Sequence, residues 1–361
     1  MRRVATLVPA LDAAGASLRG ICRTLPPVEA ILAKDHWALG KAITLVESTR
    51  PDDARRIGDL LRDLKATRKA KMPTTMESIP GTGSARPKPL KRIAISGSPG
   101  AGKSCFIEAL GMYLCKDLNL TVGVIAVDPS STMTKGSILG DKTRMTELSQ
   151  HPNAFVRPSP SRGHLGGVQA RCWEVMELLE AANFDVILVE TVGVGQSEIA
   201  VKDMSDVFVL LVPPAAGDEL QGVKKGIVEV ADCVLVTKMD GDREKLALET
   251  RMAYLHAACY TNSGAKENKP VQCISSSTKV GIDSAWETIT GIWDKRQEDG
   301  TLDANRKDQS LKHFHAYFEL ELKRRAEEKL AASVIRLEDK VVAGALSPRE
   351  AAELAMSEVM K

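Results

Sequence analysis

Residues 90–104 read LKRIAISGSPGAGKS, and this stretch decides the fold. Residues 92–95, which are apolar after Arg92, predict a short buried strand, and residues 97–104 fit the pattern G-x-x-x-x-G-K-[ST] at every fixed position. Glycine lacks a Cβ atom and adopts the positive φ angles that turn successive backbone N–H groups inward, where they and a helix N-terminus converge on a phosphate. Because an apolar helical run follows, we predict a phosphate-binding loop between a strand and a helix.

The loop and the first turn of the following helix supply the predicted phosphate contacts. Lys103 is expected to reach the β- and γ-phosphates of a nucleotide, and the Ser104 hydroxyl is expected to ligate Mg²⁺. The residues predicted to bind nucleotide in this part of the chain are Ser98, Pro99, Gly100, Ala101, Gly102, Lys103, Ser104, Cys105 and Phe106.

Further buried strands alternate with helical segments along the chain. Apolar runs at residues 120–127, 184–189, 206–212 and 232–236 predict strands that are covered on both faces, as in parallel sheets. This alternation predicts an α/β fold, namely a P-loop domain with a central, mostly parallel sheet, flanked by N- and C-terminal helical segments.

Two acidic residues stand where predicted strands end. Asp128 follows the run at residues 120–127, and Glu190 follows the run at residues 184–189. Ligands of open parallel sheets bind at the carboxyl ends of the strands, so both carboxylates are expected near the phosphate-binding loop. Carboxylate oxygens suit Mg²⁺, and we therefore predict that Asp128 and Glu190 hold this ion directly or through water.

Residues 237–240, Thr-Lys-Met-Asp, follow a predicted strand and resemble the guanine-recognition pattern N-K-x-D. The Asp240 carboxylate would accept from N1–H and the 2-amino group of guanine, a donor pair that adenine lacks, and Lys238 would lie along the base plane. Thr237 replaces the Asn of the pattern, which puts one hydrogen bond of about 1 kcal/mol in doubt. Offering Asp240 to the wrong base would still discriminate by about 10⁴-fold, so guanine is the expected base.

Three consecutive serines form a second candidate contact to the base. Ser275, Ser276 and Ser277 end the last predicted strand and occupy the S-A-x position of GTPases. Backbone N–H groups contact the guanine O6 at that position, so we predict base contacts from this turn.

Composition excludes several classes of protein. The chain has 361 residues, 43% of them hydrophobic, and a net charge of +2 without a dense Lys/Arg block, so no nucleic-acid partner is expected. It contains no run of 18 apolar residues, so no membrane span is expected. The seven cysteines are scattered and form no C-x-x-C or Cys/His cluster, which predicts reduced thiols and argues against a structural zinc site.

Four segments are predicted along the chain. Residues 1–25 are rich in arginine and poor in acidic residues, a composition shared by mitochondrial transit peptides and by ordinary basic helices, so both interpretations stay open. Residues 26–88 predict a helical domain and a linker, and residues 89–297 the P-loop domain. Residues 298–361 predict a charged C-terminal helical arm, although a packed cap fits the pattern about as well.

Six motifs occur in order at residues 97–104, 126–131, 140–145, 157–163, 190–198 and 217–222. Together they resemble the MeaB/ArgK/MMAA family, the methylmalonyl-CoA mutase-associated GTPases of the cobalamin pathway. The likeness covers roughly residues 38 to 350, and the tail at residues 340–348 also resembles the animal members.

The resemblance implies a function as well as a fold. It implies a homodimeric GTPase that binds GTP/GDP and Mg²⁺ and dimerises through its C-terminal arm. It also implies a chaperone that gates adenosylcobalamin loading and protection of methylmalonyl-CoA mutase, with no nucleic-acid or membrane partner. The location implied is the mitochondrial matrix if the source is eukaryotic, and the cytoplasm otherwise.

The resemblance also assigns residues. Asp128, Asp141 and Glu190, with the Ser104 hydroxyl, correspond to the Mg²⁺ and switch positions of the family. Residues 213–224 correspond to a third switch that senses the mutase, and Lys224 matches the lysine tied to activated hydrolysis. The predicted catalytic residues are therefore Lys103, Asp128, Asp141, Glu190 and Lys224.

The chain departs from the family pattern at two places, and other functions compete with the favoured one. Thr237 replaces the usual Asn, and residues 276–279 differ from the commoner Ala-Arg-Ser-Gly, so base contacts there are in question. A P-loop small-molecule kinase would share the phosphate-binding loop, but Asp240 argues against an adenine site. A metallochaperone-type GTPase would need His-rich or Cys-x-Cys segments, and a nucleotide-dependent scaffold would use hydrolysis only as a timer.

Overall fold

The computed structural model describes residues 24–48, 50–71, 90–128, 145–160, 165–191, 201–214, 225–261 and 269–359. Contacts divide the chain into two compact units, Met1–Asp303 and Ala304–Lys361. Asp141, Lys224 and nearly all of the predicted targeting segment lie outside the described residues.

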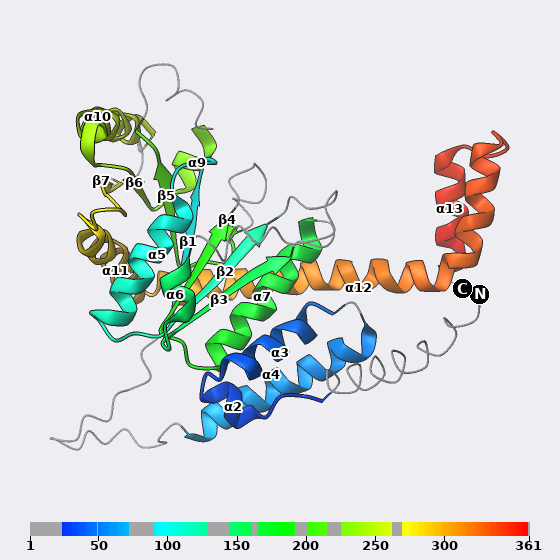
Figure 1. Ribbon diagram of the computed structural model, residues 1–361. Helices are drawn as coiled ribbons and strands as arrows, with labels where there is room; N and C mark the ends of the chain where they lie inside the picture. The colour runs from blue at the N-terminus through cyan, green and yellow to red at the C-terminus, as the bar shows by residue number, and fades with distance from the viewer. Residues whose placement is uncertain are drawn as a thin grey trace, which may run out of the picture. The chain divides into compact units, whose positions relative to one another are not determined.

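A seven-stranded sheet forms the centre of the first unit (Figure 1). The strand order is β3-β2-β4-β1-β5-β6-β7, and every neighbouring pair is parallel. The α/β fold predicted from the alternating apolar runs is therefore confirmed. The strands are β1 (Lys91–Gly97), β2 (Val122–Asp128), β3 (Ala154–Pro160), β4 (Val186–Thr191), β5 (Val207–Val212), β6 (Cys233–Val236) and β7 (Val271–Cys273).

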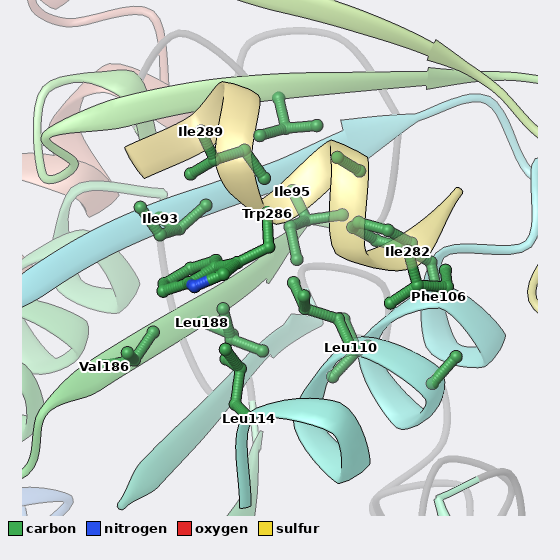
Figure 2. Close-up of a cluster of buried hydrophobic side chains, with 14 of the residues drawn as sticks. Ile93, Ile95, Phe106, Leu110, Leu114, Val186, Leu188, Ile282, Trp286 and Ile289 are labelled. Carbon is green, nitrogen blue, oxygen red and sulfur yellow. The ribbon is translucent and has the colours of Figure 1, made fainter. Parts of the chain in front are cut away.

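One face of the sheet carries a large apolar core. Side chains alternate between the two faces of a strand, so Ile93 and Ile95 of β1 both point to this face. There they pack with residues of helices α5 (Lys103–Lys116) and α11 (Ile282–Glu298), including Phe106 and Trp286 (Figure 2). The helix that carries the phosphate-binding residues is thereby fixed to the sheet by its buried face.

On the opposite face of the sheet, α7 (Leu165–Ala181) contacts β2, and two of its side chains contact the buried Arg92 of β1. The Arg92 guanidinium forms an ion pair with Glu180, and its Cζ atom lies 5.1 Å from the ring centroid of Trp173. Burying an arginine is tolerated when its charge is paired in this way. Helices therefore cover both faces of the sheet, as the continuous apolar strands predict.

Two short helices and a longer one complete the sheet's surroundings. The helix α6 (Thr146–Gln150) contacts α5 and β3, and α9 (Lys225–Val230) contacts β5. The helix α10 (Glu244–Thr261) follows a 3-10 turn at Gly241–Arg243 and contacts β6 and β7.

The strand β3 was not among the predicted strands. Its sequence AFVRPSP contains Pro158 and Pro160, which lack the N–H that a central strand must donate. In the structure β3 lies at the edge of the sheet and pairs with β2 alone, so the missing donors cost no second ladder.

The predicted N-terminal helical region consists of α2 (Val28–Leu32), α3 (His36–Val46) and α4 (Pro51–Lys71). The Asp35 side chain begins α3 by accepting from the Ala38 N–H at 2.8 Å. Both α3 and α4 contact α7. Glu47, just after α3, also forms a 2.8 Å ion pair with Arg157 of β3. These helices therefore belong to the same compact unit as the sheet.

The second unit consists of helices. The 42-residue α12 (Thr301–Val342) begins in the first unit, and α13 (Pro348–Val359) ends the described chain. Between them Gly344 adopts a φ of 70°, which favours glycine. Ser347 and Glu350 form reciprocal bonds at 2.9 and 3.2 Å, a capping box that begins α13 with Pro348 in its first position.

Candidate functional site

The phosphate-binding loop joins β1 to α5 at the carboxyl edge of the sheet. Gly100 and Gly102 have φ angles of 81° and 88°, in the left-handed region that side-chain-bearing residues rarely adopt. The Ala101 N–H donates to the Ser98 carbonyl at 3.1 Å, which closes the turn before α5 starts at Lys103. The structure thus gives the loop the backbone that the glycine pattern predicts.

Gly97 begins the loop where two strands approach closely. A Cβ atom built at Gly97 would lie 2.3 Å from the backbone oxygen of Leu211 in β5, far inside any real contact. Only glycine fits here without moving β1 away from β5. The first fixed glycine of the pattern is therefore required by packing, and the second fixed glycine, Gly102, by backbone angle, as is Gly100 at a variable position.

Lys103 folds back over the loop. Its side chain is buried, with 8% of the residue exposed, and its Nζ donates to the carbonyls of Gly97 and Ser98 at 2.7 and 3.1 Å. An ammonium held at the loop in this way supplies a compact positive charge for the phosphates of a nucleotide. The geometry is consistent with the predicted role of Lys103.

Ser104 and Glu190 lie side by side next to the loop. The Ser104 hydroxyl donates to Glu190 Oε1 at 2.9 Å, and both residues are buried. Glu190 stands near the end of β4, opposite Ile95 of β1 in the register, so adjacent strands bring the two together. A hydroxyl and a carboxylate supply the hard oxygen ligands that Mg²⁺ prefers, so the residues present fit this ion.

Of the other predicted metal and switch residues, the structure places the backbone of Asp128. Asp128 is the last residue of β2, and its neighbour Val127 pairs with Thr191 of β4, so its backbone lies at the same edge as Glu190. Asp141 and Lys224 fall outside the described residues, and their roles stay predictions.

Thr237 connects the base-recognition loop to the phosphate-binding loop. Its buried hydroxyl donates to the Ala101 carbonyl at 2.7 Å, while its backbone N–H donates to Val212 at 2.9 Å. The bracing hydrogen bond that the missing Asn put in doubt is thus made by a threonine hydroxyl. Residue 237 is Thr where the pattern has Asn, and a hydrogen bond still joins the base-recognition loop to the phosphate-binding loop.

Asp240 is held by two serines. Ser275 and Ser277 both donate through their hydroxyls to Asp240 Oδ2, at 2.5 and 2.6 Å. These two bonds hold the pKa of the Asp240 carboxyl below its ordinary value, and the bond from Ser275 has the larger effect. The positive charges of Arg243 and Lys238 also lower this pKa. The carboxylate therefore stays charged as the acceptor that guanine requires.

The serine hydroxyls are a functional contribution that the sequence did not predict. The three serines were expected to act through their backbone N–H groups, whereas the structure gives Ser275 and Ser277 a side-chain bond to Asp240. Ser276 stands between them in the same turn, at residues 276–278. A run of hydroxyl residues opposite an acidic loop was the available signal.

The last two residues of the predicted phosphate set point in different directions. The Phe106 side chain is fully buried in the core shared with α11, and its N–H already donates to Gly102 at 2.9 Å (Figure 2). The Phe106 side chain is therefore not available for the predicted contact with nucleotide, and its N–H is already engaged within the chain. Cys105 is exposed, as are Ser98 and Pro99 in the loop.

Two features are absent from the residues that the structure describes. No group of three or more His, Cys, Asp and Glu residues is placed to share a metal ion there. None of the helices in that part of the chain combines the length and apolar character that a membrane crossing requires.

A parallel sheet, a G-x-x-x-x-G-K-S loop between β1 and α5, and a carboxylate at the end of β4 define a P-loop nucleotide-binding protein. The chain's family follows from comparison with known proteins. Residues 39–331 match the family described as "Methylmalonyl Co-A mutase-associated GTPase MeaB". The chain belongs to this family, as the six motifs indicated, and it is a GTPase.

Relatives of known name support the assignment. The chain is 45% identical over 290 residues to a "Probable GTPase" of Mycobacterium tuberculosis, covering 78% of each chain. It is 41% identical to the mouse "Methylmalonic aciduria type A homolog, mitochondrial", covering 88% of this chain and 74% of that one. A crystal structure titled "LAO/AO transport system kinase" has a TM-score of 0.63 and 31% identity, covering 92% of this chain and 96% of that one.

Proposed function

We propose that this protein is a GTP-hydrolysing chaperone that gates adenosylcobalamin loading and protection of methylmalonyl-CoA mutase. The observation that carries the proposal is the match of residues 39–331 to a family whose description names the mutase. The mouse and nematode relatives named for methylmalonic aciduria support the same assignment. In a eukaryotic source the protein would act in the mitochondrial matrix, and otherwise in the cytoplasm.

Hydrolysis would rest mainly on positioning and charge neutralisation. Lys103 and the backbone N–H groups of the loop would hold the β- and γ-phosphates. Ser104 and Glu190, joined at 2.9 Å, would hold Mg²⁺, with Asp128 and Asp141 as further carboxylates. Bound Mg²⁺ would neutralise charge that develops on the phosphate oxygens.

Base choice would rest on Asp240. Its carboxylate is kept charged by two hydroxyl donors and two nearby cations, and a charged carboxylate matches the paired donors of guanine. Thr237 would keep this loop in register with the phosphate-binding loop through its bond to Ala101. Guanine specificity separates this function from a small-molecule kinase that uses ATP.

Coupling to the mutase would rest on residues 213–224. We expect the partner to bring Lys224 onto the γ-phosphate, because a cation delivered there contributes about 10³–10⁵ in rate. Hydrolysis would then report correct engagement of the mutase and end one round of cofactor loading.

A homodimer is proposed through the second unit. Leu311, Phe314, Phe318 and Leu322 follow one face of α12 at spacings of three and four residues, and each is between 56% and 60% exposed. The Phe314 and Phe318 rings stack with centroids 6.3 Å apart. An apolar face of this kind is costly to expose, which supports its burial against a second copy of the chain.

Replacing Phe314 and Phe318 by Asp should shift the protein to a monomer in sedimentation, whereas Lys312→Asp should not.

The proposal is tested by a binding and loading experiment with purified methylmalonyl-CoA mutase. The full chain is mixed with the mutase in the presence of GDP or a non-hydrolysable GTP analogue, and complex formation and transfer of adenosylcobalamin are measured. We expect a complex in both states and cofactor transfer that depends on the nucleotide. Equal transfer with and without the chain would contradict the chaperone function while leaving the GTPase assignment intact.

A further inference from the structure

Ser277 offers a hydroxyl where the pattern Ala-Arg-Ser-Gly has an arginine. Residues 276–279 depart from the commoner Ala-Arg-Ser-Gly pattern, and in the structure the Ser277 hydroxyl donates to Asp240 Oδ2 at 2.6 Å. Ser275 donates to the same oxygen at 2.5 Å, and the two hydroxyls lie 3.0 Å apart. One short turn therefore holds a single carboxylate oxygen of Asp240 with two hydroxyls.

After the two serine bonds, the Asp240 carboxylate still has acceptor sites for guanine. An ionised carboxylate offers about four lone-pair sites, and the two serines occupy two of them. Because both serines donate to Oδ2, the two sites that remain are on Oδ1, and they equal in number the two donors, N1–H and the 2-amino group, on the edge of guanine. With Oδ2 fixed by two hydroxyls, the plane of the carboxylate no longer rotates freely about the last side-chain torsion, which is otherwise broad.

The turn that carries Ser277 is itself held to the Asp240 loop by backbone bonds. The Met239 N–H donates to the Ile274 carbonyl at 3.0 Å, and the Ser275 N–H donates to the Val280 carbonyl at 2.9 Å. The Thr278 N–H donates to Ser275 Oγ at 3.2 Å. The hydroxyls are thus placed by the backbone before any base has to be bound.

We propose that Ser277 is a positioning residue that sets base specificity, by holding the Asp240 carboxylate in the orientation that accepts both guanine donors. The inference rests on the proposed function, in which Asp240 recognises guanine. It goes further by naming a side chain that acts through Asp240 at a position where the family pattern has another residue. Ser277 is exposed, so its hydroxyl is not needed to fill the core.

The groups around Asp240 determine the pH at which its carboxyl loses its charge. Lys238 and Arg243 are the cations that act on the carboxyl, and Ser275 and Ser277 are its hydroxyl donors. Because the pKa of Asp240 lies below its ordinary value, the carboxylate loses its charge only as the pH falls through that lowered pKa. The contribution of Asp240 to guanine binding should therefore stay constant between about pH 8 and pH 5.

The test compares diphosphates that differ only in the base. Dissociation constants of GDP and inosine diphosphate, which lacks the 2-amino group, are measured at neutral pH for the full chain and three variants. Ser277→Ala should weaken GDP binding about fivefold and inosine diphosphate binding less, so the preference for GDP falls. Ser277→Thr keeps the hydroxyl and should therefore keep the preference for GDP. Thr278→Ala should also leave the preference unchanged, because Thr278 contacts Ser275 through its backbone N–H.

Two outcomes would overturn the inference. One is a Ser277→Ala variant whose preference for GDP over inosine diphosphate equals that of the unchanged chain. The other is an equal loss in Ser277→Ala and Thr278→Ala, which would indicate general loosening of the turn. The variant Asp240→Asn distinguishes failure of the Ser277 inference from failure of the proposed function. If Asp240 recognises guanine, this variant should lose the preference for GDP and gain binding of xanthosine diphosphate. If Asp240→Asn keeps the preference, guanine is recognised elsewhere and the base assignment itself is wrong.

Discussion

The phosphate-binding loop and the base-recognition loop meet at one hydrogen bond, from Thr237 to Ala101, yet they are built on different principles. The first matches its pattern at every fixed position and depends on backbone geometry, with positive φ angles at Gly100 and Gly102 and a close approach at Gly97. The second departs from its pattern and depends on side-chain hydroxyls around Asp240.

The difference explains which positions tolerate change. A position that requires a positive φ angle or the absence of a Cβ atom accepts only glycine, whatever chemistry a substitute offers. A position that requires a hydrogen-bond donor accepts any side chain whose donor reaches the same acceptor, as the Thr237 hydroxyl does. We therefore expect substitutions at the phosphate end to be more damaging than those at the base end.

Lys103→Ala should have the largest effect. Removing the ammonium beside the loop should lower kcat/KM for GTP by about 10³-fold or more, because a preorganised positive charge at the phosphates is lost. Steady-state hydrolysis measures this, and thermal unfolding should show a folded protein. Lys116→Ala, at the other end of α5 and 57% exposed, is the matched control and should hydrolyse GTP normally. Unchanged turnover in Lys103→Ala would refute the phosphate-binding assignment.

Glu190→Gln should have the next largest effect. The amide keeps the shape and still accepts from Ser104 but removes the negative charge, so hydrolysis should fall by about 10²-fold at low Mg²⁺. A Mg²⁺ titration of GTP hydrolysis should show the midpoint moving to higher concentration. Glu287→Gln on the exposed side of α11 should leave the titration unchanged. An unshifted midpoint in Glu190→Gln would place the ion on other ligands.

Gly97→Ala should mainly change stability. The added Cβ would lie 2.3 Å from the Leu211 backbone oxygen, so β1 and β5 must separate, at about 2 to 3 kcal/mol of unfolding free energy. Denaturant unfolding measures the loss. Gly291→Ala, in α11 with no atom within 4 Å of the new Cβ, should instead be neutral or stabilising. Equal stability of the two variants would show that the close approach is not required.

Much of the fold could be predicted because its signals are local. The strand at residues 92–95, the glycine loop and the apolar run of α5 follow one another in the sequence, and β1 and α5 bear this out. The strand β3 could not be predicted, because prolines are compatible with a strand only at a sheet edge, and edge position is a property of the whole sheet.

The candidate site shows the same limit at the scale of single atoms. Patterns identified Ser104, Glu190 and Asp240 because each chemistry demands those residue types, and the sheet brings the first two together. Patterns could not show that Thr237 bonds Ala101, or that Ser277 bonds Asp240, because those bonds depend on which acceptor a hydroxyl reaches across two loops. Only the spatial arrangement of separate segments decides that.

Thr237→Val should have the smallest effect of the four, and it tests whether the bond between the loops matters. Valine has nearly the same shape but no hydroxyl, so the Ala101 carbonyl loses its 2.7 Å donor inside a buried region. The loss is worth about 1 kcal/mol, or about fivefold in GDP affinity if the loops must stay in register to bind base and phosphate together. Thr237→Ser keeps the donor and should bind GDP nearly as the unchanged chain does. If Thr237→Val lowers stability by this amount while GDP affinity stays the same, the hydroxyl holds the loop but does not align the base, and the two halves of the site act independently.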